Sequence, residues 1–118
     1  MITYHGPQAR LSEVIDDIRH QIPEALLVVV PAGDSKEAAM EQFAAAFDFP
    51  AWFGGNLDAL EECLTDAVRA ADRPLALFWD SVGQLSHHDP GAAAAITAVL
   101  QDVAAEQESL WVAILGRA

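Results

Sequence analysis

The sequence has few of the features that mark exported or membrane proteins. Its single cysteine, Cys63, cannot form an internal disulfide. No apolar run approaches the roughly 20 residues that a membrane-spanning helix needs. Residues 1–6 contain neither the basic segment nor the apolar segment of a secretory signal. Together these absences predict a protein of the reducing cytoplasm that does not insert into membranes.

Basic residues are also scarce, with six Lys and Arg against 18 Asp and Glu and a formal net charge of −12. A chain this acidic is repelled by nucleic acid and by anionic membranes, so we expect it to bind neither. The same charge steers basic proteins toward it, although acidity is also typical of an ordinary solvated surface. The distribution of charge favours a basic partner, because residues 37–68 contain no Lys, Arg or His but seven Asp and Glu.

Apolar patterning predicts one α/β domain over residues 1–118. Hydrophobic residues make up 53% of the chain, which is enough to form a core. Aliphatic runs bounded by turn residues predict buried strands at 26–30, 74–79 and 110–115, and residues 2–4 are a candidate fourth strand. Strands that alternate with helices imply a small parallel sheet of three strands, or four with residues 2–4, packed with helices.

Helical spacing of apolar residues predicts four helices between these strands. Each is preceded by a residue suited to cap a helix N-terminus. The predicted caps, in chain order, are Ser12, Asp34, Asn56 and Asp89. Pro90 after Asp89 strengthens the last of these predictions, and His87-His88 is expected to be a loop before that helix.

The helix predicted at 57–69 has the most informative surface. Its apolar positions share one face, which we expect to be buried. The opposite face carries Asp58, Glu61, Glu62, Thr65 and Asp66. Like-charge pairs four residues apart, such as Asp58–Glu62 and Glu62–Asp66, destabilise a helix by roughly 0.2–0.5 kcal/mol each. The pattern therefore favours counter-charges supplied by a partner, while a plain solvated face remains the alternative.

An aromatic loop precedes this helix. Trp52 and Phe53 stand outside any helical or strand period that would bury them, and Gly54-Gly55 allows a partner's backbone to approach closely. Aromatic residues are enriched at interface hot spots, so we expect a partner to bind here. The alternative is that at least one ring turns back into the core.

The string from Pro50 to Thr65 resembles the barstar family, intracellular inhibitors of a secreted bacterial ribonuclease. The family carries an aromatic pair, Gly and one further residue, then Asn-Leu-Asp-Ala-Leu, an aromatic, Asp and Cys-Leu-Thr. The resemblance covers about residues 26–115, and residues 1–24 look like an N-terminal addition to the family core. It implies a parallel sheet packed with helices, and an inhibitor that plugs a ribonuclease active site with carboxylates in place of RNA phosphates.

The family's partner-binding positions carry over one by one. The matching residues are Trp52, Phe53, Gly54, Asn56, Asp58 and Thr65. Glu62 stands where the family places its most important Asp, and Glu61 replaces an aromatic residue. Trp52 and Phe53 replace tyrosines, so both hydroxyl groups are lost. For a further family contact, a Glu on the last helix, Glu106 is the nearest candidate. These departures are compatible with an inhibitor of this class, but they leave the identity of the inhibited ribonuclease open.

Other chemistries fit the sequence less well. Asp58 and Glu62 are expected on a convex helix, with no pocket to raise the pKa of either carboxyl for catalysis. No Asp-rich loop has the spacing of a calcium or magnesium site, and Cys63 suits a buried packing position. We therefore expect no enzyme activity and no cofactor. Two hypotheses remain: a one-to-one inhibitor of a basic ribonuclease or related toxin, and an acidic module for another basic protein.

Overall fold

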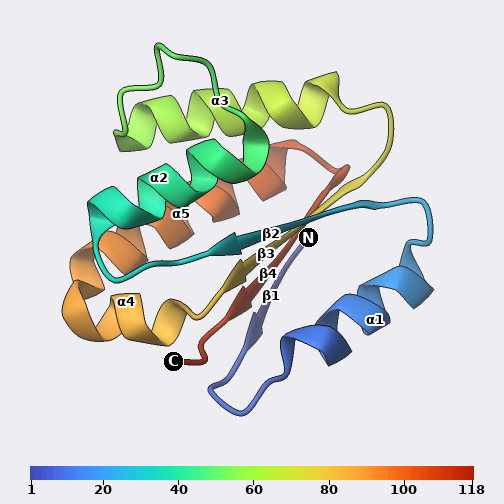
Figure 1. Cartoon of the computed structure of the whole chain (residues 1–118). Coiled ribbons are helices and arrows are strands. Elements are labelled where there is room, and N and C mark those ends of the chain that lie inside the picture. Colours follow the sequence, from blue (N-terminus) through green and yellow to red (C-terminus); the bar gives the residue numbers. More distant parts are fainter.

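The computed structural model describes all 118 residues and contains four strands and five helices (Figure 1). In chain order the elements are β1 (Ile2–His5), α1 (Leu11–Gln21), β2 (Leu26–Pro31), α2 (Lys36–Phe47), α3 (Leu57–Ala70), β3 (Leu75–Asp80), α4 (Val82–His88), α5 (Pro90–Glu106) and β4 (Leu110–Leu115). None of the five helices combines the length and the apolarity that crossing a membrane requires.

The strands form one parallel sheet in the order β1-β4-β3-β2. All six residues of the central strand β3 are buried, and Leu77 lies between Val28 of β2 and Val112 of β4. The α/β fold class is confirmed. The segment at 2–4 is the fourth strand, and it lies at the edge of the sheet beside β4.

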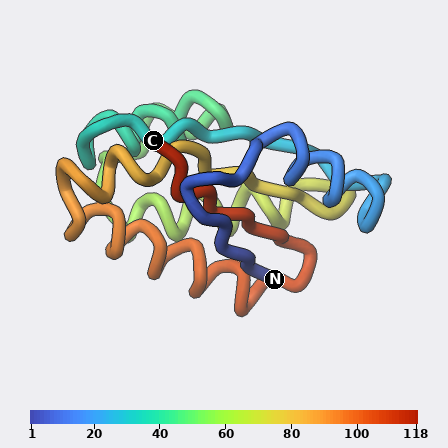
Figure 2. The backbone as a smooth tube through the Cα atoms, turned by 90° about the horizontal axis from the view of Figure 1, so that it is seen from below, coloured from blue at the N-terminus to red at the C-terminus, as the bar shows by residue number.

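Different helices cover the two faces of the sheet, because the chain crosses it in two directions. From β1 to β2 the chain moves from one edge to the other, and from β2 through β3 to β4 it returns strand by strand. Parallel crossovers are right-handed almost without exception, so opposite directions require opposite faces. Accordingly, α1 lies on one face and α2 to α5 lie on the other (Figures 1 and 2).

The hydrophobic core is divided by the sheet into a large part and a small part. Leu77 and Trp79 face the large part, which the helices α2, α3 and α5 close. Ala76 and Phe78, which point to the other side of β3, pack with Val14 of α1 in the small part. Burying a side chain of Leu or Phe size contributes about 1.5–3 kcal/mol, so most of the stabilisation lies on the face of α2 to α5.

The helix caps are partly as predicted. The side chains of Asn56 and Asp89 accept hydrogen bonds from the backbone N–H groups of Ala59 and Ala92, at 2.8 and 3.0 Å. Helix α2 is capped by Ser35, whose Oγ accepts from the N–H of Ala38 at 3.0 Å, so the prediction of Asp34 was wrong. Ser35 follows Asp34 directly, and its hydroxyl accepts a hydrogen bond from one of the free backbone N–H groups in the first turn of α2.

Helix α1 begins one residue before its predicted cap. Leu11 is its first residue, and Ser12 lies inside the first turn. The Arg10 carbonyl accepts from the N–H of Val14 at 3.1 Å, and no side chain caps the helix. Leu11 packs against the small part of the core, which gives a reason for its inclusion in the helix.

Helix α4 corrects the prediction of a loop at His87-His88. The side chains of Val82 and Leu85 are buried at a spacing of three, but seven residues are too few to show a clear period.

The C-terminal residues Gly116 and Arg117 pack against α4. A Cβ at Gly83 would lie 2.6 Å from the Gly116 carbonyl oxygen, and the Gly83 N–H donates to the Arg117 carbonyl at 3.1 Å.

Candidate functional site

Helix α3 presents the acidic surface on the side that faces away from the core. Leu60, Cys63, Leu64 and Val68 are buried, as their spacing predicts. The side chain of Asn56 caps the helix, and Gly55 before it adopts φ +68°, a conformation that favours glycine. The cap and the apolar stripe therefore set which residues α3 turns toward solvent.

The outward surface of α3 is lined by Asp58, Glu61, Glu62, Thr65, Asp66 and Arg69. The carboxylates of Asp58, Glu62 and Asp66 are exposed, whereas Glu61 and Thr65 are half-buried. The two ion pairs of the protein are Arg19–Asp16 and Arg117–Asp80, and both lie outside this helix. None of the acids of α3 therefore forms an ion pair, and the one base on this surface is Arg69, in the last turn of the helix.

Burial and the acidic surface both act on Cys63, which lies on the buried side of the helix. Burial raises the pKa of the Cys63 thiol, and the neighbouring carboxylates of Glu62 and Asp66 raise it further. A thiol with a raised pKa is mostly protonated and weakly nucleophilic at neutral pH. This agrees with a packing role for Cys63.

The loop that joins α2 to α3 separates its two aromatic residues. The ring of Phe53 packs 5.0 Å from Phe49, which stacks on Phe47 at 5.7 Å, so Phe53 turns back onto the protein. Trp52 is 56% exposed and is one of the largest apolar side chains open to solvent. The loop thus provides one exposed aromatic residue and one that supports the loop from beneath.

Glu106 lies at the other end of the helical layer from the aromatic loop. Helices α3 and α5 run side by side in the same direction, and Glu106 is the last residue of α5 (Figure 1). From Asp58 to Ala70 the helix rises about 18 Å. Asp102, one turn earlier on the same side of α5, is also exposed and was not predicted. The packing of α5 beside α3 is a tertiary contact, which the local sequence does not reveal.

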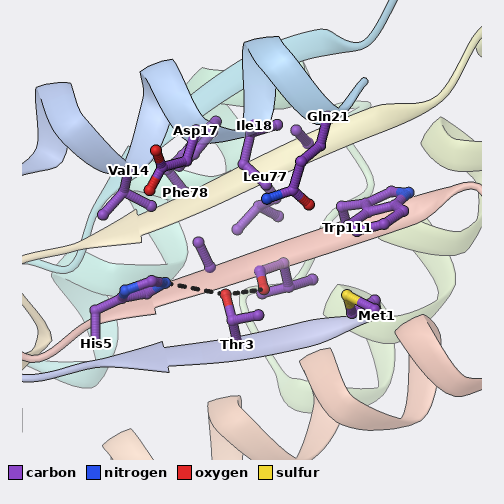
Figure 3. Close-up of a pocket in the computed structure, with 13 residues that line it drawn as sticks. Met1, Thr3, His5, Val14, Asp17, Ile18, Gln21, Leu77, Phe78 and Trp111 are labelled. Carbon is purple, nitrogen blue, oxygen red and sulfur yellow. Dashed lines mark hydrogen bonds between the residues drawn. The ribbon is translucent and has the colours of Figure 1, made fainter. Parts of the chain in front are cut away.

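A separate cavity of about 90 Å³ lies on the opposite face of the sheet, between α1 and strands β1, β3 and β4 (Figure 3). It is mostly apolar, with Trp111 at one end and His5 at the other. The His5 ring is 3.0 Å from the Thr3 hydroxyl. None of the residues predicted to bind a partner lines this cavity, so it is unrelated to the acidic surface.

No group of three or more His, Cys, Asp or Glu side chains is arranged to hold a metal ion. What the arrangement offers chemically is an unpaired acidic helix beside an exposed aromatic ring. Such a surface suits binding to a cationic, partly apolar surface of another macromolecule.

Comparison with known proteins gives one family. The model described as "Barstar (barnase inhibitor)" matches residues 25–114, which are 90 of the 118 residues. The match begins after α1 and includes the aromatic loop, all of α3 and Glu106. No curated protein gives a significant match to the sequence.

Proposed function

The chain belongs to the barstar family, and on that premise we propose that it inhibits a small basic ribonuclease by inserting the acidic surface of α3 into the active site. The sequence from Pro50 to Thr65 predicted membership of this family, and the family match confirms it. The family is one of inhibitors. The observation that carries the mechanism is the absence of any ion pair among the acids of α3.

The chemistry of the proposed inhibition follows from what a ribonuclease binds. An enzyme that holds RNA phosphates needs cationic side chains in its active site, and these attract carboxylates as well. Asp58 and Glu62 lie one turn apart on the exposed side of α3, so both are available to the same cationic site. The helix keeps them in place before binding, which lowers the entropic cost of the complex.

The surrounding residues are assigned supporting roles in this proposal. The exposed ring of Trp52 covers apolar surface of the enzyme, and Gly54 allows close approach of the two backbones. Asn56 caps α3 and so orients Asp58. Glu61 and Thr65 extend the contact along the helix, and Glu106 or Asp102 adds a carboxylate from α5.

Several features point to a ribonuclease that differs from the enzyme bound by other members of the family. Glu62 is one methylene longer than the Asp expected there, and Trp52 and Phe53 lack the tyrosine hydroxyl groups. We propose one-to-one binding in the cytoplasm, where Cys63 remains reduced. We also propose that residues 1–24, which form β1 and α1, are an addition to the family core, since the match starts at residue 25.

A panel of small basic ribonucleases, assayed with increasing amounts of the purified protein, tests the proposal. We expect at least one enzyme to lose activity at an equimolar endpoint, with an association rate that falls as salt is raised. Ribonucleases of neutral or acidic pI provide the control. If none of the basic enzymes were inhibited or bound, the proposal would fail, and an acidic module for another basic protein would take its place.

A further inference from the structure

A groove beside the aromatic loop extends the acidic surface from α3 to α2. It is lined by the first three turns of α2 and by residues 53–55 of the loop, and its volume is about 610 Å³. Met40, Ala44 and Phe53 supply its apolar part and are buried or half-buried, whereas Glu37 and Glu41 are exposed. The groove therefore combines an apolar patch with a charged rim on α2, where the two glutamates outnumber Lys36.

The two glutamates of the groove repeat the charge pattern of α3. Glu37 and Glu41 are four residues apart, so their carboxylates lie on the same side of α2 and repel each other. The one base in the lining is Lys36, and it forms no ion pair with either glutamate. As on α3, adjacent carboxylates form no ion pair within the protein.

The shape and charge of the groove select its occupant. Arginine and lysine combine an aliphatic stem, which packs on apolar surface, with a cationic head that stays at the polar rim. Met40, Ala44 and Phe53 match the stem, and Glu37 and Glu41 match the head. We propose that this groove binds an arginine or lysine side chain of the same ribonuclease that docks on α3. The inference rests on the proposed function.

One enzyme is able to contact both the groove and the acidic surface of α3, because the same loop borders both. Residues 53–55 line the groove, and Asn56, the next residue, caps the helix that carries Asp58 and Glu62. A partner that covers Gly54 therefore contacts the edge of the groove. The groove would then help to select a ribonuclease with a basic residue outside its active site.

Binding kinetics with the ribonuclease inhibited most strongly in the panel test the groove. The double variant Glu37→Gln/Glu41→Gln is compared with Glu13→Gln/Glu24→Gln, which removes the same charge from exposed positions in and just after α1. Long-range steering lowers the association rate in both variants, whereas a direct contact also raises the dissociation rate. We expect the dissociation rate to rise roughly tenfold in the groove variant alone. Equal dissociation rates in the two variants would overturn the inference.

A second measurement needs no ribonuclease. We would follow backbone amide chemical shifts during titration with N-acetyl-arginine methylamide, and with the citrulline analogue, which has nearly the same shape but no charge. We expect the arginine probe to change the amide chemical shifts of Met40, Gly54 and Gly55 by at least about twice as much as the citrulline probe does. In the variant Glu37→Gln/Glu41→Gln, we expect the two probes to give equal changes. Equal shifts for the two probes, or shifts elsewhere only, would refute the groove. Probe binding there without inhibition of any ribonuclease would keep the groove and reject the proposed function.

Discussion

Helices α1 and α3 lie on opposite faces of the sheet, and an acidic residue forms an ion pair on α1 but none does on α3. On α1, Asp16 is followed by Arg19 and His20; Arg19 Nη1 lies 4.0 Å from an Asp16 carboxylate oxygen, and His20 Nδ1 lies 2.7 Å from the Asp16 carbonyl oxygen. On α3, the first base is Arg69 in the last turn, and no ion pair forms.

We interpret this difference as that between a solvated surface on α1 and the docking surface that we propose for α3. An exposed ion pair such as Arg19–Asp16 is worth only about 0–1 kcal/mol, so bases are easily accommodated on an exposed helix. Their absence between Asp58 and Asp66 leaves two repulsive pairs that cost roughly 0.2–0.5 kcal/mol each. A partner that supplies cations removes this repulsion when it binds.

The largest expected effect is the loss of affinity when acids of α3 are replaced by Ala. An equal loss from replacing acids of α1 would remove the distinction between the two helices. We expect Asp58→Ala and Glu62→Ala each to weaken the complex with the inhibited ribonuclease by about 2 kcal/mol or more, roughly 30-fold, because each leaves a basic residue of the enzyme unpaired. Asp16→Ala and Asp17→Ala on α1 are the matched controls, with an expected change of less than about threefold. Calorimetric titration measures all four, and similar losses on the two helices would contradict the assignment.

Two tryptophans extend the comparison to the aromatic residues. Trp52 is 56% exposed, whereas Trp111 is half-buried and packs against the small part of the core. We expect Trp52→Ala to lower affinity by about 1–2 kcal/mol and to leave the free energy of unfolding unchanged. Trp111→Ala should do the reverse. Urea denaturation and binding titration of both variants provide the check; a loss of stability in Trp52→Ala would show that its ring supports the loop instead.

A basic residue introduced on α3 tests whether repulsion between its acids lowers the stability of the protein. Glu62→Lys turns two repulsive pairs, with Asp58 and Asp66, into attractive ones, so we expect the free energy of unfolding to increase by about 1 kcal/mol. The same variant should no longer inhibit the ribonuclease. Arg19→Glu on α1 should lower stability and leave inhibition intact. Urea denaturation at low salt measures the effect, and an unchanged or lower stability of Glu62→Lys would argue against repulsion on α3.

The smallest effect concerns pH. The pKa of the Cys63 thiol is raised above its ordinary value of 9.0, chiefly by burial and then by Glu62 and Asp66. The unfolded chain therefore releases this proton at a lower pH than the folded protein does. The contribution to stability is complete below pH 9.0 and is lost as the pH rises through the folded-state pKa. Denaturation curves of the wild type and Cys63→Ala, measured across this range, should diverge; parallel curves would show that the thiol does not titrate differently on folding.

Much of the fold could be predicted because its signals are local. The aliphatic runs at 26–30, 74–79 and 110–115 are strands, and the apolar stripe of α3 is its buried side. The errors lie where local signals are weak or ambiguous. Asp34 and Ser35 are both good caps, and the backbone geometry selects Ser35. Helix α4 shows too few apolar positions, Val82 and Leu85, to distinguish it from a loop.

The sequence by itself determined which residues of α3 are acidic and turned away from its apolar stripe, because these properties follow from helical spacing within one segment. Only the tertiary structure decided that Phe53 turns back onto Phe49 while Trp52 remains exposed. It also decided that Glu37 and Glu41 share a groove with the loop, and that α5, which Glu106 ends, packs beside α3. Each of these depends on how separate elements pack against one another, and the spacing of residues within one element does not encode that packing.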